Sequence, residues 1–211
     1  MSIPADGLSL QGELDVPADA TGVVAFAHGS GSSRHSPRNR QVAQSLKQAG
    51  LATLLFDLLD AREEAQDTRT RRLRFDVELL GRRLVAAIDW LAADPATATM
   101  PVGCFGASTG AAAALIAAAH RPERVAAVVS RGGRPDLAGR ELAAVRAPTL
   151  LIVGGEDAIV IDLNRQTQQH LNCEHRLEIV QGASHLFEEP GTLERVAELA
   201  SSWFAHWLAM R

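Results

Sequence analysis

The sequence is poor in aromatic residues: they make up 4% of its 211 residues, and tyrosine is absent. A chain of this composition has little aromatic surface with which to hold a substrate, so polar contacts must contribute more of the binding energy. It also lacks an excess of positive charge, because the formal net charge is −4. We therefore expect no nucleic acid and no membrane among its partners.

Cysteine is scarce as well, and neither Cys104 nor Cys173 belongs to a Cys-x-x-Cys pair. This spacing disfavours a metal knuckle or a redox motif. Residues 1–12 lack the basic and apolar regions of a signal peptide, and no uninterrupted apolar run is long enough to cross a membrane. We expect a cytoplasmic protein with reduced thiols that needs no metal or cofactor, acts on a small molecule, and is a monomer or small homo-oligomer.

Short apolar runs alternate with amphipathic segments along the whole chain. Segment 7–17 alternates apolar and polar residues, which predicts a half-exposed strand or hairpin. Buried strands are predicted at 22–29, 51–59 and 101–105, and further strands at 124–130, 147–155 and 175–180. Helices are predicted at 38–50, 70–94, 111–120, 136–145, 161–171 and 192–210. This order predicts an α/β fold with a mainly parallel central sheet and helices on both faces. No repeat or composition shift divides the chain, so we expect one domain over residues 1–211.

One basic cluster stands out, formed by Arg69, Arg71, Arg72 and Arg74 and interleaved with Asp67 and Asp76. It lies at the start of the helix predicted at 70–94. Because acidic residues alternate with the arginines, a solvated helix face is the favoured interpretation, and a ligand site is the alternative.

A serine flanked by glycines lies between a predicted strand and a predicted helix, in Gly106-Ala107-Ser108-Thr109-Gly110. This Gly-x-Ser-x-Gly pattern at a strand-to-helix turn is typical of a nucleophile elbow. The glycines leave room for a tight turn, and the alanine-rich helix that follows can approach the sheet closely. The alternative is that Ser108 only caps the helix.

A nucleophilic serine needs a base, and the base needs an acid that orients it. Asp157 follows the strand predicted at 147–155, and His185 lies after the last strand and before the last helix. The order Ser, Asp, His is that of the elbow-containing hydrolases. We therefore predict Ser108, Asp157 and His185 as a catalytic triad, with Glu156 as the second choice for the acid. A capping role for Asp157 and a plain loop position for His185 are the alternatives.

The oxyanion hole requires two N–H donors directed at one point. The residue after the nucleophile, Thr109, is predicted to supply one. The loop after the strand at 22–29 is predicted to supply the other, from Ser30 in preference to Gly31. His28 in this loop is expected to brace the backbone.

These residues resemble an α/β-hydrolase of the dienelactone-hydrolase-like group. The resemblance extends from about residue 8 to the end and rests on His28-Gly29, the 106–110 motif, Asp157 and His185. It implies the α/β-hydrolase fold and the activity of a serine esterase. Dienelactone hydrolases proper resemble this layout with a cysteine nucleophile, whereas this chain has Ser108, which favours ester or acyl chemistry over a lactone substrate.

The predicted activity is hydrolysis of small soluble esters, thioesters or lactones through an acyl-enzyme. Cofactor-free haloperoxidase-like or lyase-like chemistry on the same triad is one alternative, and a non-catalytic binding domain is another. The interval 130–148 has room for one short helix, so we expect no cap domain and an open site.

Three residues near the expected site are predicted to contact the substrate. Arg34 and Arg131 are predicted to bind an anionic group, and Phe187 is predicted to form an apolar wall. The alternative for the arginines is ion pairing with Asp57, Asp60 or Asp136.

Overall fold

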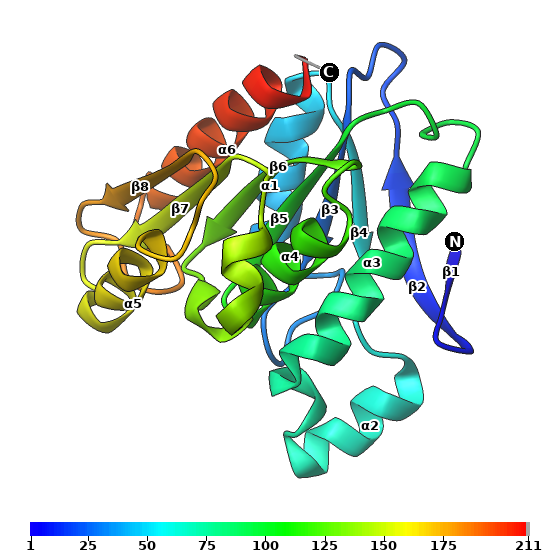
Figure 1. Ribbon diagram of the computed structural model, residues 1–211, viewed down its shortest axis with the longest axis horizontal. Helices are drawn as coiled ribbons and strands as arrows, with labels where there is room; N and C mark the ends of the chain where they lie inside the picture. The colour runs from blue at the N-terminus through cyan, green and yellow to red at the C-terminus, as the bar shows by residue number, and fades with distance from the viewer. Residues whose placement is uncertain (210–211) are drawn as a thin grey trace.

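The computed structural model describes residues 1–209, which contain an eight-stranded sheet in the order β1-β2-β4-β3-β5-β6-β7-β8 (Figure 1). Strands β3 to β8 are parallel, whereas β1 and β2 form an antiparallel hairpin at one edge. The strands are β1 Ser2–Ala5, β2 Leu8–Asp15, β3 Val23–Ala27, β4 Ala52–Phe56, β5 Val102–Ala107, β6 Val125–Arg131, β7 Thr149–Gly154 and β8 His175–Val180.

Helices cover both faces of this sheet, as the alternating sequence pattern predicts (Figure 1). On one face α3, α4 and the 3₁₀ segment η2 pack over a large apolar cluster, while α1 and α6 pack on the other. The helical elements are α1 Pro37–Gln48, α2 Ala61–Thr70, η1 Leu73–Phe75, α3 Val77–Ala93, α4 Thr109–His120, η2 Pro135–Ala144, α5 Ala158–Gln168 and α6 Thr192–Leu208. Met210, where the last helix is predicted to end, lies outside the described residues.

The strand order positions the functional site. Strand β3 lies between β4 and β5, so the chain proceeds to one side of β3 and then returns to the other. Ligands of open α/β sheets bind at such a reversal, beyond the carboxyl ends of the strands. The loop after β3 and the turn after β5 meet there, and these segments hold the predicted oxyanion donors and nucleophile.

The helix predicted at 70–94 is wrong in its first third. Helix α2 occupies 61–70 instead, Arg71 has a left-handed conformation with φ of 53°, and α3 begins only at Val77. The buried carboxylate of Asp67 causes the break, since it accepts the backbone N–H groups of Leu73 and Arg74 at 2.7 and 3.3 Å. The carboxylate of Asp76 then caps α3 by accepting the N–H of Leu79.

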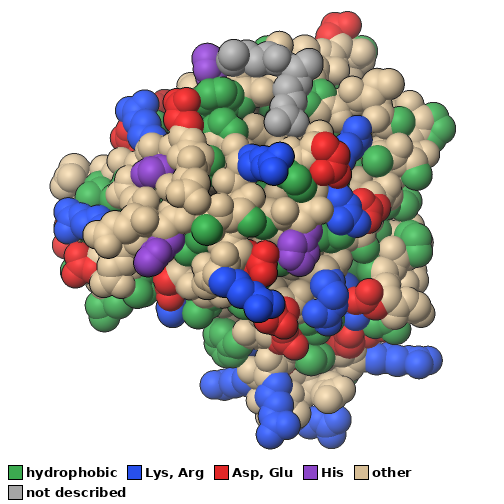
Figure 2. All heavy atoms as spheres, viewed as in Figure 1, with side chains coloured by type: hydrophobic (Ala, Val, Ile, Leu, Met, Phe, Trp, Pro, Cys, Tyr) green, Lys and Arg blue, Asp and Glu red, His purple; other side chains and the backbone are tan. Residues whose placement is uncertain are grey.

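The basic cluster is mostly exposed, as its acidic neighbours indicate. Arg69, Arg71 and Arg72 are exposed, and Lys and Arg side chains gather at the end of the molecule where α2 lies (Figure 2). Arg74 is different, because its guanidinium donates to the buried carboxylate of Asp67. The cluster is therefore a solvated surface with one member used inside the fold.

Strands β6 and β7 are joined through η2 alone, so the described part of the chain has no separate cap domain. The segment between β6 and β7 therefore provides no lid over the carboxyl ends of the strands. No helix in the described residues is long and apolar enough to cross a membrane.

Candidate active site

Ser108 has a strained backbone at the end of β5, with φ of 51° and ψ of −120°. A non-glycine residue holds such a conformation only where its surroundings enforce it, and such residues cluster at functional sites. The flanking glycines make the turn possible. A Cβ on Gly106 would lie 2.5 Å from the Cα of Ala111, and one on Gly110 would lie 2.1 Å from the carbonyl oxygen of Ala27.

The side chain of Ser108 does not cap α4, although the residue stands at the capping position. The helix-cap alternative is therefore not supported. The Ser108 hydroxyl is only partly buried at the carboxyl edge of the sheet, where a substrate can reach it.

Asp157 and His185 are brought together from segments 28 residues apart. Oδ2 of Asp157 lies 2.6 Å from Nδ1 of His185, and Asp157 makes no capping hydrogen bond to α5. The carboxylate of Asp157 is 16% exposed and the imidazole of His185 is 40% exposed, so solvent reaches the imidazole more readily than the carboxylate. This pairing fixes the ring and directs Nε2 away from the acid, as a general base requires. Glu156, the second choice for the acid, is not the partner of His185.

The backbones of Ser108 and His185 both lie close to the end of β6. The N–H of Ser108 donates to the carbonyl of Arg131 at 3.2 Å, which ties the elbow to the end of β6. A Cβ on the next residue, Gly132, would lie 2.9 Å from the carbonyl oxygen and 3.7 Å from Cε1 of His185. Gly132, with φ of 50°, thus lets the His185 loop approach the elbow, a requirement that the sequence analysis did not identify.

The loop after β3 passes directly over the elbow. A Cβ on Gly29 would lie 3.2 Å from both the carbonyl oxygen of Ala107 and the Cβ of Ser108. Ser30 follows Gly29, and Thr109 opens α4, where first-turn N–H groups have no partner within the helix. Their assignment as oxyanion donors remains a prediction that this placement supports.

His28 braces this loop, as expected from the sequence. Its Nε2 accepts the N–H of Leu58 at 3.1 Å, and Nδ1 lies 3.0 Å from the carbonyl oxygen of Gly29. Since Nε2 accepts, the ring is neutral with its proton on Nδ1. Burial lowers the pKa of His28, and the Gly29 carbonyl and the Asp57 and Glu64 charges only partly oppose this.

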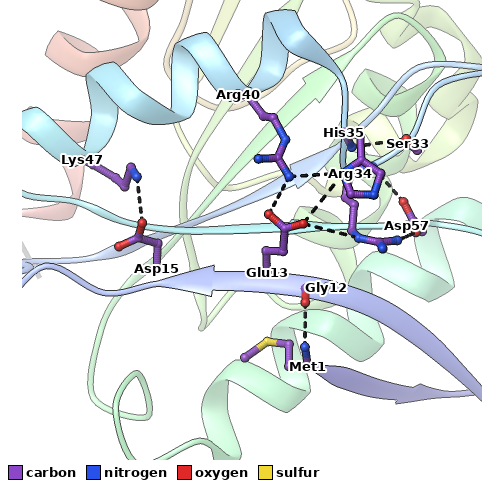
Figure 3. Close-up of polar contacts among 10 residues, drawn as sticks. All are labelled: Met1, Gly12, Glu13, Asp15, Ser33, Arg34, His35, Arg40, Lys47 and Asp57. Carbon is purple, nitrogen blue, oxygen red and sulfur yellow. Dashed lines mark hydrogen bonds and ion pairs between the residues drawn. The ribbon is translucent and has the colours of Figure 1, made fainter.

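Arg34 is held in ion pairs with acidic side chains. Its guanidinium contacts the carboxylate of Asp57, and its Nε lies 3.6 Å from Glu13, which Arg40 also contacts (Figure 3). The ion-pair alternative thus describes the position of Arg34, and a substrate role for it rests only on the prediction. The neighbouring hollow of about 870 Å³ is lined by Arg34 and Asp57 and does not include Ser108.

Arg131, in contrast to Arg34, is buried and forms no ion pair within the described residues. Its side chain is buried, its Nε has no hydrogen-bond partner, and its Cζ lies 5.9 Å from the ring centroid of Phe187. Phe187 itself is buried and has a left-handed φ of 56°. Arg131 and Phe187 are therefore together beside His185, and their roles in substrate binding remain predictions.

Glu189 stabilises the loop that contains His185. Oε2 of Glu189 accepts the N–H of Ser184 at 2.9 Å, which holds the turn that presents His185. Backbone and side-chain hydrogen bonds from Ser184 lower the pKa of Glu189. No sequence pattern distinguished Glu189 from Glu188. Residues 1–209 contain no cluster of three or more His, Cys, Asp or Glu side chains that could hold a metal ion.

The chain is similar to proteins of known family and structure. A model of the dienelactone hydrolase family matches residues 10–210. The crystal structure of a dienelactone hydrolase from Anabaena variabilis is 60% identical, with a TM-score of 0.97 over 99% of this chain and 96% of that one. An esterase domain from Rhodothermus marinus is 20% identical, with a TM-score of 0.77 over 99% of this chain and 98% of that one, and shares the fold.

Two Mycobacterium tuberculosis proteins with the provisional name of phosphoribosyl transferase are 57% identical over 204 residues. These residues are 97% of this chain but 45% of each relative, so the chain spans less than half of their length.

Proposed function

The chain belongs to the dienelactone hydrolase family, and we propose that it is a serine hydrolase that cleaves small soluble esters, thioesters or lactones through an acyl-enzyme. One observation carries this proposal: the carboxylate of Asp157 is bound to Nδ1 of His185 instead of capping α5. A carboxylate–imidazole pair at the same sheet edge as a strained serine is the arrangement of acyl transfer.

The proposed reaction has two halves, formation of the acyl-enzyme and its hydrolysis, and His185 accepts and then donates a proton in each half. Oγ of Ser108 attacks the carbonyl carbon, and its proton passes to Nε2 of His185. The N–H groups of Ser30 and Thr109 stabilise the oxyanion of the tetrahedral intermediate. The leaving alcohol or thiol then takes the proton from His185 as its bond to the acyl carbon breaks. Water then gives a proton to the same imidazole as its oxygen attacks the acyl carbon. The bond from that carbon to Oγ of Ser108 breaks, His185 returns the proton to Oγ, and the acid is released.

We infer small substrates because the described residues include no cap domain over this edge and the chain has few aromatic residues with which to bind a large apolar group. In this proposal Phe187 forms an apolar wall beside His185 and Arg131 binds an anionic group, which is supported by the burial of Arg131 beside the Phe187 ring. The transferase name of the mycobacterial relatives belongs to proteins more than twice as long as the matched segment. It does not extend to this chain, whose elbow and Asp157–His185 pair suit acyl transfer.

Labelling with a fluorophosphonate tests the proposal. The reagent should modify Ser108 in the intact protein, and Ser108→Ala should abolish both labelling and ester hydrolysis, lowering kcat/KM by about 10³-fold or more. Because alanine only shortens a partly exposed side chain, the thermal unfolding of the variant should match that of the wild type. Residual hydrolysis within tenfold of wild type would contradict the assignment. Failure of the wild type to react at all would favour a non-catalytic binding domain.

A further inference from the structure

The guanidinium of Arg131 is buried without a counter-charge. The residue is 6% exposed, Nε is fully enclosed without a hydrogen bond, and no carboxylate within residues 1–209 forms an ion pair with it. Nε of Arg83, the other buried arginine within residues 1–209, is likewise enclosed without a partner, but its Nη atoms donate to the Ala5 carbonyl and to Glu63 at 2.7 and 2.8 Å. Burying an unpaired charge is costly, so its retention points to a partner outside the chain.

A second guanidinium lies near the loop that Arg131 contacts. Arg38, in the first turn of α1, contacts Glu188, and Glu188 follows Phe187, whose ring centroid lies 5.9 Å from Cζ of Arg131. The charge of Arg38 adds to the effect of burial in lowering the pKa of Arg131. Nε of Arg38 is also enclosed without a partner. The carboxylate near Arg38 is that of Glu188, which is mostly exposed and lies 3.4 Å from its Nη1. Two positive charges thus converge with little neutralisation.

This pair borders the proposed catalytic residues. Arg131 ends β6, and its carbonyl accepts the N–H of Ser108. Its guanidinium lies over Phe187, whose ring and that of His185 both approach Gly132. Arg38 reaches the same loop from α1 through Glu188. A group bound between the two guanidiniums would be attached to a molecule that reaches Ser108.

We propose that Arg131 and Arg38 bind a doubly charged oxyanion group of the substrate, of the phosphate or phosphonate type. Two guanidiniums match two negative charges, and the three terminal oxygens of a tetrahedral group can accept hydrogen bonds from both guanidiniums at once. A carboxylate has one charge and two oxygens and would leave one guanidinium uncompensated. The proposal rests on the hydrolase function proposed above, because the bound group belongs to the substrate of that site.

Inorganic phosphate is the probe that tests this subsite, with ionic strength held constant by NaCl. Phosphate should inhibit hydrolysis of a neutral aryl ester competitively, and acetate should inhibit far less. Arg131→Gln should raise the inhibition constant of phosphate by about 30-fold or more, measured against the variant's own rate on the neutral ester. The matched control is Arg40→Gln on the same helix, because Arg40 is paired with Glu13 and should leave the constant within about twofold.

A second arm uses aryl esters of equal length that end in a methyl, a carboxylate or a phosphonate group. The phosphonate ester should be preferred, and Arg131→Gln should remove that preference. Equal inhibition by phosphate and acetate, unchanged inhibition in Arg131→Gln, or equal use of the carboxylate and phosphonate esters would overturn the proposal.

A binding measurement separates this inference from the proposed reaction. Phosphate should raise the unfolding temperature of Ser108→Ala as it does that of the wild type, and Arg131→Gln should abolish the rise. If Ser108 proves unreactive but this rise is seen, the subsite stands and the hydrolase assignment fails. If Ser108 reacts but no Arg131-dependent rise occurs, the subsite is wrong and the hydrolase assignment stands.

Discussion

Replacing Arg131 with methionine should stabilise the protein, although the residue is buried in the core region beside the site. The guanidinium has no carboxylate partner within residues 1–209, and the charge of Arg38 further disfavours its charged form. Methionine has a similar length and no charge, so it fills most of the same space beside Phe187. An arginine kept at the expense of stability is expected where it serves a ligand.

The magnitude follows from the electrostatic cost of the buried charge. Burial, with a smaller contribution from Arg38, lowers the pKa of Arg131 to about 10. At about 1.4 kcal/mol per pH unit, a displacement of this size corresponds to about 3 kcal/mol. A lowered pKa means that folding disfavours the charged form. The cost is therefore fully present at pH 7 and is relieved only as the pH rises through 10 towards the ordinary arginine range.

Loss of the contact between Arg131 and the Phe187 ring opposes this gain by about 1–2 kcal/mol. We expect Arg131→Met to raise the free energy of unfolding by about 1–2 kcal/mol and the unfolding temperature by about 3–6 °C. The assay is urea denaturation at pH 7.5 followed by tryptophan fluorescence, without added phosphate or sulfate.

The matched control is Arg83→Met, which removes the other buried arginine. Arg83 is bonded to Glu63 and to the Ala5 carbonyl. Its removal leaves these acceptors without their donor, so the variant should lose about 2–4 kcal/mol. If Arg131→Met loses more than about 1 kcal/mol, Arg131 makes net favourable contacts within the protein, and the reasoning from its unpaired charge is wrong.

Three further predictions concern the elbow and its surroundings. Asp157→Asn should lower kcat/KM for an aryl ester by about 10³–10⁴-fold, whereas Glu156→Gln should change it by less than about threefold; the reverse order would make Glu156 the acid. Gly110→Ala should lose more than about 3 kcal/mol or fail to fold, because its Cβ would meet the Ala27 carbonyl; a thermal scan matching the wild type would refute this. Because burial lowers the pKa of His28, its stabilising contribution is present above pH 6.5 and is lost as the pH falls below it. The difference in unfolding free energy between wild type and His28→Asn should therefore shrink from pH 7.5 to pH 5, and a constant difference in urea titrations would count against the bracing role.

Local sequence patterns accounted for most of the fold. The buried strands are recognisable because they are continuous apolar runs between glycines, prolines and polar residues, and the structure confirms the parallel sheet with helices on both faces. The exception is segment 61–76, where helical periodicity favoured a helix from Thr70. The buried carboxylate of Asp67 ends α2 there by binding backbone N–H groups six and seven residues ahead. Apolar periodicity carries no information about such a hydrogen bond.

The sequence by itself determined the elbow and the order of the proposed triad, because a tight strand-to-helix turn demands small residues at fixed positions around Ser108. It could not determine which charges are paired. Arg34 and Arg131 are equivalent as sequence, each following a buried strand. Only the tertiary structure decides that the end of β4 brings Asp57 to Arg34, whereas Arg131 is enclosed with Phe187 and Arg38 and meets no carboxylate. Ion pairing depends on contacts between segments far apart in the chain, and those contacts exist only once the sheet has assembled.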